Sequence, residues 1–121
     1  MASLNRLEII GNLGNAPEMK FSPSGKPMTS FNVATNWVYT SSEGERKQET
    51  EWFNVITWGK LAEQCNQFLD KGKLVYAEGR LHTRRWEDNE GVKHTQVELI
   101  ANKVIFLDKR GNGDKEEEEP I

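Results

Sequence analysis

The chain has 121 residues, enough for one domain whose hydrophobic core needs neither disulfides nor a structural metal. Its single cysteine, Cys65, excludes an intramolecular disulfide and favours a reducing compartment, which we expect to be the cytoplasm (or an organelle, if a presequence was removed). No apolar run is long enough to span a membrane, and the first residues lack the apolar core of a signal peptide.

The formal net charge of −3 is unevenly distributed along the chain. Residues 1–113 contain 15 of the 16 Lys and Arg and 14 of the 19 Asp and Glu, whereas residues 114–121 contain five acids and one Lys. The body is therefore nearly neutral, and the acidic excess belongs to a segment that cannot bury apolar surface. We expect one folded domain over residues 1–108 and a disordered acidic tail over residues 109–121.

Hydrophobic periodicity predicts a chain made mostly of strands. In chain order the expected strands are 4–13, a short one at 20–21, 31–37, 50–58, 74–86 and 94–107. Residues 40–48 are polar and aperiodic and predict a mobile loop, and residues 88–91 predict a turn. Only residues 60–71 have helical spacing, with a buried stripe that includes Cys65 and Phe68 and a C-terminal cap at Gly72.

This order of elements matches one known architecture. Five main strands with a helix between the third and the fourth are the outline of the OB-fold, an all-β, five-stranded Greek-key barrel. We therefore predict this fold class.

The surroundings of the aromatic residues suggest a binding function. Trp52 and Trp58 are six residues apart, so both project from one face of a regular strand. Trp86 ends a strand, and Trp37 and Tyr39 lie where a strand enters a polar stretch. Because any base can stack on an aromatic ring, these five residues are predicted stacking sites for single-stranded nucleic acid. The alternative is that the tryptophans form the core, although a small barrel has little room for four of them.

Basic residues are interleaved with these aromatic positions and are the predicted contacts to phosphates. The candidates are Arg6, Lys47, Lys60, Lys73, Arg80, Arg84, Arg85 and Lys93. For each of them, an ordinary solvated surface position is the competing interpretation.

Catalysis and metal binding are not expected. Cys65 lies on the apolar stripe of the predicted helix, which is typical of a small buried hydrophobe and not of a nucleophile working with His82 or His94. One Cys and two His without close spacing do not make a structural zinc site. We predict no enzymatic activity, no metal and no cofactor.

The acidic tail ends in an apolar pair, which leaves two interpretations open. A run of like charge usually keeps a protein soluble. The alternative is a peptide ligand whose last residues bind replication or repair proteins. The residues predicted to make that contact are Glu118, Glu119, Pro120 and Ile121.

Several motifs together resemble the bacterial and mitochondrial single-stranded DNA-binding proteins. They include NLG at residues 12–14, FNVAT at 31–35, TEWFNV at 50–55, GKLAE at 59–63 and TRRW at 83–86, in order and with family-like spacing over roughly residues 4–107. The resemblance implies an OB-fold and a homotetramer that wraps single-stranded DNA. It also implies stacking at Trp52, Trp58 and Trp86, and at either Trp37 or Tyr39. Family tails typically end in Pro and Phe, so Ile121 departs from the pattern and places recruitment through the tip in question.

The predicted function is sequence-nonspecific binding and protection of single-stranded DNA in replication, recombination and repair. One alternative keeps the barrel but makes it a protein-interaction module, such as a primosome accessory protein. Another is RNA binding, as in cold-shock-type barrels, where the 2′-hydroxyl would be recognised.

Overall fold

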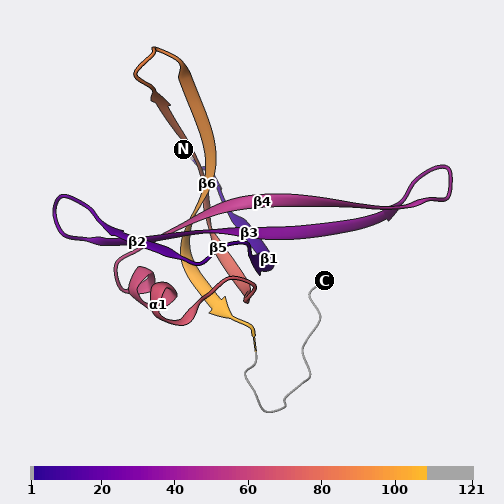
Figure 1. Ribbon diagram of the computed structural model, residues 1–121, viewed down its shortest axis with the longest axis horizontal. Helices are drawn as coiled ribbons and strands as arrows, with labels where there is room; N and C mark the ends of the chain where they lie inside the picture. The colour runs from indigo at the N-terminus through magenta and orange to yellow at the C-terminus, as the bar shows by residue number, and fades with distance from the viewer. Residues whose placement is uncertain (1, 109–121) are drawn as a thin grey trace.

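The computed structural model describes residues 2–108, which form six strands and one helix (Figure 1). In chain order the elements are β1 (Leu7–Leu13), β2 (Glu18–Phe21), β3 (Pro27–Thr40), β4 (Arg46–Trp58), α1 (Lys60–Phe68), β5 (Leu74–Glu87) and β6 (Lys93–Phe106). The predicted tail, 109–121, with its four proposed contact residues, lies outside the described residues. Within the described part, no helix is long and apolar enough to cross a membrane.

Five of the strands close into a barrel. β5 is antiparallel to both β1 and β6, β6 runs parallel to β4, and β4 is antiparallel to β3. The ring closes where Asn12 and Leu13 of β1 pair with Ala34 and Val33 of β3. The short β2 pairs only with β3 and lies at the sheet edge. The predicted five-stranded OB-fold is confirmed. The helix lies between the third and fourth main strands, as predicted; these are β4 and β5 because the short β2 is also numbered.

Alternate residues of the strands fill the barrel. Because side chains of a strand alternate between its two faces, one face of each long strand points inward and excludes water. The largest of these interior side chains is Phe31, which is almost completely buried. The other members of the core cluster are Ile9, Leu13, Val33, Val55, Cys65, Leu69, Val75, Ala77, Leu99 and Ala101.

Helix α1 packs against the barrel through its predicted apolar stripe. Ala62, Cys65 and the following Leu69 are buried, as the helical spacing predicts. The Thr29 hydroxyl donates a 2.7 Å hydrogen bond to the carbonyl of Ala62, which ties the helix to β3. The helix is therefore held by both apolar burial and a buried hydrogen bond.

The predicted end of the helix was wrong by three residues. The helix ends at Phe68, because Leu69 adopts an extended conformation that directs its side chain into the core. Gly72, with φ of 89°, belongs instead to a turn in which the Lys73 amide donates to the carbonyl of Asp70. Phe68, predicted to be buried, is exposed at the last helical position and contacts Phe106.

Two hairpins extend beyond the barrel in different directions (Figure 1). The β3–β4 hairpin stays paired as far as Thr40 and Arg46, so the loop predicted over residues 40–48 was wrong and the connection covers only 41–45. Its outer part is exposed on both faces and so lacks the alternation that reveals a strand. The turn predicted at 88–91 is confirmed: the Asp88 carboxylate accepts hydrogen bonds from the amides of Glu90 and Val92.

Candidate nucleic-acid interface

Strands β4, β6 and β5 share a continuous surface on the outside of the barrel. Asn54 and Ile56 of β4 pair with Glu98 and Ile100 of β6, and paired residues lie on the same face of a sheet. Glu98 and Ile100 in turn pair with residues of β5. We define the outer face by alternate residues of the three strands: Trp52, Asn54, Ile56 and Trp58 of β4; His94, Gln96, Glu98 and Ile100 of β6; Arg80, His82, Arg84 and Trp86 of β5.

None of the four tryptophans belongs to the core. The exposed fractions are 62% for Trp37, 60% for Trp52, 39% for Trp86 and 38% for Trp58. Trp52 and Trp58 project from the same face of β4, as their spacing predicts. The alternative interpretation of the tryptophans as core residues is therefore wrong.

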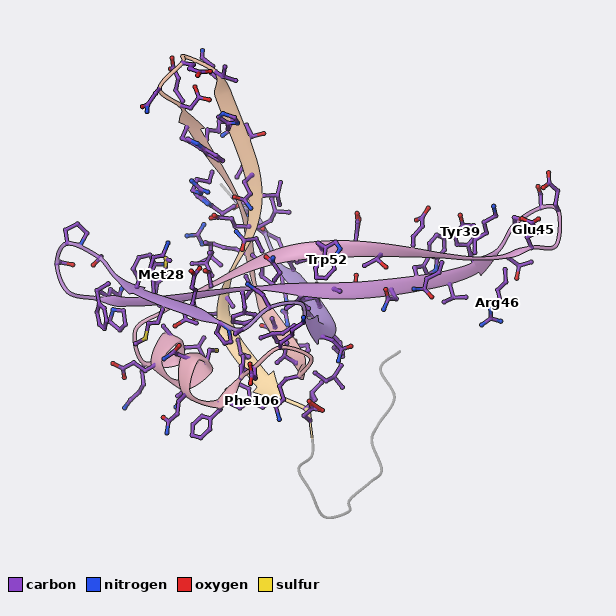
Figure 2. All side chains as sticks on the ribbon, in the orientation of Figure 1. Met28, Tyr39, Glu45, Arg46, Trp52 and Phe106 are labelled. Carbon is purple, nitrogen blue, oxygen red and sulfur yellow. The ribbon has the colours of Figure 1, made fainter. Side chains whose placement is uncertain are left out.

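Trp52 has room because its neighbours are small. Trp52 lies on β4 (Figure 2). It pairs with Ala34 of β3, and a Cβ atom added at Gly14 would collide with carbons of the indole ring. The ring is thus supported from the barrel side and open to solvent on the other. This combination of support and exposure is what a nucleobase needs to stack.

Trp58, at the end of β4, is accompanied by a cation that the sequence analysis missed. The ammonium of Lys26 lies 5.5 Å from the centroid of the ring, within the range of a cation–π contact. Lys26 precedes β3 and becomes a neighbour because Met28 pairs with Trp58. Only the strand register could have revealed this pair.

Trp86 is covered by two neighbours. The guanidinium carbon of Arg84 lies 4.2 Å from the ring centroid, and the His94 ring stacks at 5.1 Å with an interplanar angle of 20°. His94 Nε2 lies 2.9 Å from a carboxylate oxygen of Asp88, and this hydrogen bond, with the amide of Val92, lowers the pKa of Asp88. No local pattern in the sequence indicates that the His94 ring stacks on Trp86, because the contact joins two strands.

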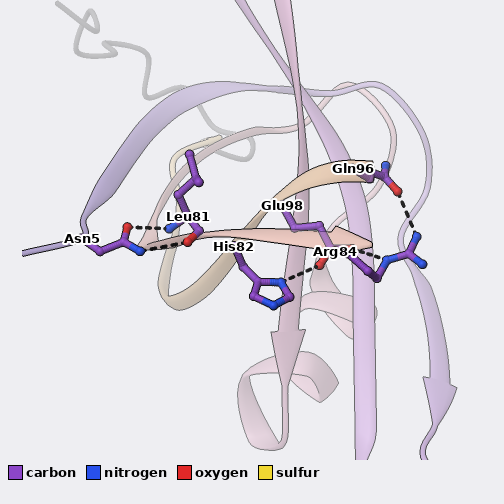
Figure 3. A network of polar contacts seen from close by, with 6 residues as sticks. All are labelled: Asn5, Leu81, His82, Arg84, Gln96 and Glu98. Carbon is purple, nitrogen blue, oxygen red and sulfur yellow. Dashed lines mark hydrogen bonds and ion pairs between the residues drawn. The ribbon is translucent and has the colours of Figure 1, made fainter. Parts of the chain in front are cut away.

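A buried carboxylate, Glu98, organises a network of polar side chains on the outer face (Figure 3). Glu98 accepts a 3.0 Å hydrogen bond from Arg84 Nε, and its other oxygen lies 3.5 Å from His82 Nδ1. Arg84 also donates through Nη2 to the side-chain oxygen of Gln96 at 3.0 Å. Arg84 is therefore held by an acid, an amide and the Trp86 ring at once.

Trp37 and Tyr39 form one aromatic unit on the β3–β4 hairpin. They lie two residues apart on the same face, with ring centroids 4.8 Å apart and an interplanar angle of 24°. This is the face of Phe31 and Val33, opposite to the face of Trp52. Because the two rings stack on each other, the structure gives no reason to choose between them as alternatives. Trp37 also lines a groove of about 770 Å³ between β1 and β3.

The basic residues predicted to contact phosphates differ in whether they already form ion pairs with acidic side chains. Arg6 lies 2.8 Å from Glu8 and 3.5 Å from Glu78, which raise the pKa of its guanidinium further, and Lys47 lies 3.5 Å from Glu45. Arg84 is paired with Glu98. The remaining candidates have no ion pair among the described residues: Lys60, Arg80, Arg85 and Lys93 are exposed, and Lys73 is half-buried.

Strand register separates the basic residues near Trp86. Arg80 and Arg84 share the outer face with it, whereas Arg85 projects from the opposite face of β5. Arg84 therefore contacts Trp86, Arg80 shares their face further along β5, and Arg85 lies on the reverse of the hairpin.

Cys65 is packed in the core, away from both histidines. Burial raises the pKa of its thiol to about 12, although a hydrogen bond with Thr57 opposes the shift. His82 and His94 instead contact the carboxylates of Glu98 and Asp88 on the outer face. The structure does not assemble the pairing of Cys65 with a histidine that nucleophilic catalysis would need.

The high pKa of Cys65 predicts a slow reaction with alkylating reagents. At pH 8 the folded protein should react with iodoacetamide far more slowly than the urea-unfolded chain, because only the thiolate attacks. Mass spectrometry at timed intervals would measure this ratio. Equal rates in the folded and unfolded states would show that Cys65 is accessible and ionised.

Within residues 2–108, no three His, Cys, Asp or Glu side chains are placed so that they could hold a metal ion together. The expectation that the protein needs no metal stays a prediction.

Comparison with known proteins identifies the family. The sequence model of the Single-strand binding protein family matches residues 4–107, which is most of the chain. The chain belongs to the single-strand binding protein family. It is 40% identical over 111 residues to Single-stranded DNA-binding protein 1 of Chlorobaculum tepidum, covering 91% of this chain and 68% of the relative. It is 39% identical over 108 residues to the Single-stranded DNA-binding protein of Neisseria meningitidis, covering 89% of this chain and 62% of the relative.

The fold also agrees with a solved structure of the family. The Plasmodium falciparum SSB complex with ssDNA superposes with a TM-score of 0.83 at 32% identity, covering 89% of this chain and 98% of the other. The family resemblance read from the motifs is therefore confirmed. Because the chain spans less than two thirds of the length of the Neisseria relative, the activities and partners of that whole protein are not transferred with the fold.

Proposed function

We propose that this protein binds single-stranded DNA without sequence preference and protects it during replication, recombination and repair. The observation that carries the proposal is the outer face, where Trp52, Trp58 and Trp86 lie exposed on one continuous sheet surface. Every base has an aromatic face, so stacking on these rings tolerates any sequence. The names of the relatives and the structure with single-stranded DNA support the same partner.

Stacking and electrostatics have unequal weight in this proposal. Several candidate cations are already paired with acids, as shown for Arg6, Lys47 and Arg84. The unpaired outer-face cation Arg80, with Lys60, Lys73, Arg85 and Lys93, would contact phosphates. Because the body of the chain is nearly neutral, we assign most of the affinity to the rings and only a moderate salt dependence to the cations. The Trp37–Tyr39 unit would provide a further stacking surface on the β3–β4 hairpin.

We further propose that the protein assembles as a homotetramer, as the family resemblance implies, and has no enzymatic activity. Several stacking surfaces on one assembly would bind a strand with high avidity. We place the protein in the cytoplasm, associated with the nucleoid. The residues of the tail, 109–121, would follow the folded domain of residues 1–108 and contact replication or repair proteins through Glu118, Glu119, Pro120 and Ile121.

Tryptophan fluorescence tests single-strand binding directly. Titration with poly(dT) should quench the emission strongly, because bases stack on exposed indoles, and raising the salt should reverse part of the signal. Duplex DNA should produce little quenching, since its bases are already stacked. Absence of quenching by poly(dT) at low salt would contradict the proposal and favour a protein-interaction module.

Competition with an RNA oligomer of the same sequence separates the two nucleic acids. Preference for RNA would indicate recognition of the 2′-hydroxyl. Analytical ultracentrifugation of the free protein and of the DNA complex would measure the number of protomers.

A further inference from the structure

We propose that Glu98 restrains Arg84 against Trp86 and thereby limits how strongly the outer face holds a phosphate backbone. This inference rests on the proposed function, because its readout is affinity for single-stranded DNA. It assigns a role to an acidic residue that lies within a surface otherwise suited to an anionic ligand.

Glu98 is unusual among the residues that the structure describes. It is the one buried charged side chain between residues 2 and 108, with an exposed fraction of 6%. Its carboxylate meets Arg84 Nε at 3.0 Å on one side and His82 Nδ1 at 3.5 Å on the other. A carboxylate so far removed from water is stable only while a cation and hydrogen-bond donors remain beside it.

Arg84 is fixed by three contacts at the same time. Besides the bond to Glu98, its Nη2 donates to Gln96 at 3.0 Å, and its guanidinium carbon lies 4.2 Å from the centroid of the Trp86 ring. The charge of Arg84 is paired with that of Glu98, and its planar group lies against the Trp86 ring. A phosphate that draws Arg84 away must leave the buried Glu98 without its cation, which is costly.

Two other groups on the outer face, Arg80 and His94, show what is particular to Arg84. Arg80 lies on the same face of β5 and is exposed without an ion pair among the described residues, so it can contact a phosphate with no competing acid. His94, the other neighbour of the Trp86 ring, is held by Asp88, whose side chain is 37% exposed. Of the two neighbours that cover Trp86, Arg84 is therefore the one that a buried acid restrains.

Replacing Glu98→Gln tests the proposal. The amide keeps an oxygen that can accept the bond from Arg84 but removes the negative charge. The variant should bind poly(dT) more tightly at low salt, and its plot of log affinity against log salt should be steeper by about 0.7, the contribution of one added phosphate contact on a single strand. Between about 50 and about 200 mM salt this amounts to roughly 2.5-fold of additional affinity loss relative to the wild type.

A matched control separates this local effect from a change in net charge. Glu63→Gln removes one acid from the exposed surface of α1 and should leave the slope unchanged. If the wild type shows no binding to poly(dT), the proposed function fails. If the wild type binds but Glu98→Gln matches Glu63→Gln, or binds more weakly, the restraint by Glu98 is overturned while the proposed function stands.

A second substitution keeps the proposal testable if Glu98→Gln does not fold. Gln96→Glu places a second carboxylate beside Arg84 Nη2, and Gln67→Glu makes the same charge change on the exposed surface of α1. Gln96→Glu should weaken binding more than Gln67→Glu does. Equal affinities for these two variants would contradict the proposal. Circular dichroism and urea unfolding of each variant would establish that its fold is intact.

Discussion

Trp52→Ala is expected to lower the affinity for single-stranded DNA more than the loss of any other single stacking ring on the outer face. Trp52 is the most exposed of the three outer-face tryptophans and is supported by small neighbours at positions 14 and 34. Stacking of one base is worth about 1–3 kcal/mol, so the affinity should fall by roughly 5- to 150-fold. Fluorescence anisotropy with a labelled oligo(dT) would measure the change.

Two further variants connect this expected loss to stacking. Trp52→Phe keeps an aromatic ring and should lose less affinity than Trp52→Ala. Gly14→Val keeps residue 52 a tryptophan but introduces carbons where its ring now lies, so it should displace the ring and weaken binding as well. Unchanged affinity in Trp52→Ala would remove this residue from the interface.

Gly79→Ala is expected to destabilise the barrel by about 1–3 kcal/mol, the usual cost of forcing extra atoms into a packed site. Gly79 lies at an irregularity in the β5–β6 pairing, and an added Cβ would collide with the carbonyl of Ile100 and with Cα of Ala101. Both of these neighbours belong to the backbone and cannot rotate away. The free energy of unfolding in urea would measure the loss.

Gly44→Ala provides the contrasting case. Gly44 has φ of 83° with open space around its Cα, so its substitution should cost only the backbone strain of a left-handed residue, about 1–2 kcal/mol. Gly79 has no positive φ, and without the collision an alanine there would stabilise the protein by restricting the unfolded chain. A neutral or stabilising Gly79→Ala would therefore show that the strand pairing adapts to the added methyl group.

Gly79→Ala should also weaken DNA binding, because β5 carries Arg80, Arg84 and Trp86 beyond this point.

Some features were predictable because they depend on local sequence. Alternation identified the central parts of the long strands, and the three-to-four spacing identified α1 and the burial of Cys65. The same alternation placed Trp52 and Trp58 on one face of β4. Local signals failed where the outcome depended on a partner: residues 46–48 became strand through pairing with β3, and Phe68 became exposed because the helix ends there.

The sequence by itself determined the fold class, the family and the aromatic residues available for stacking, because these depend on residue type and short-range spacing. Only the tertiary structure decided which charges remain free and which rings are covered. The contacts of Lys26 with Trp58, of His94 with Trp86 and of Glu98 with Arg84 join residues from different strands or turns. Such neighbours are set by strand register, which pairs residues that are distant in the chain, and no local pattern reports which cross-strand partner each side chain meets.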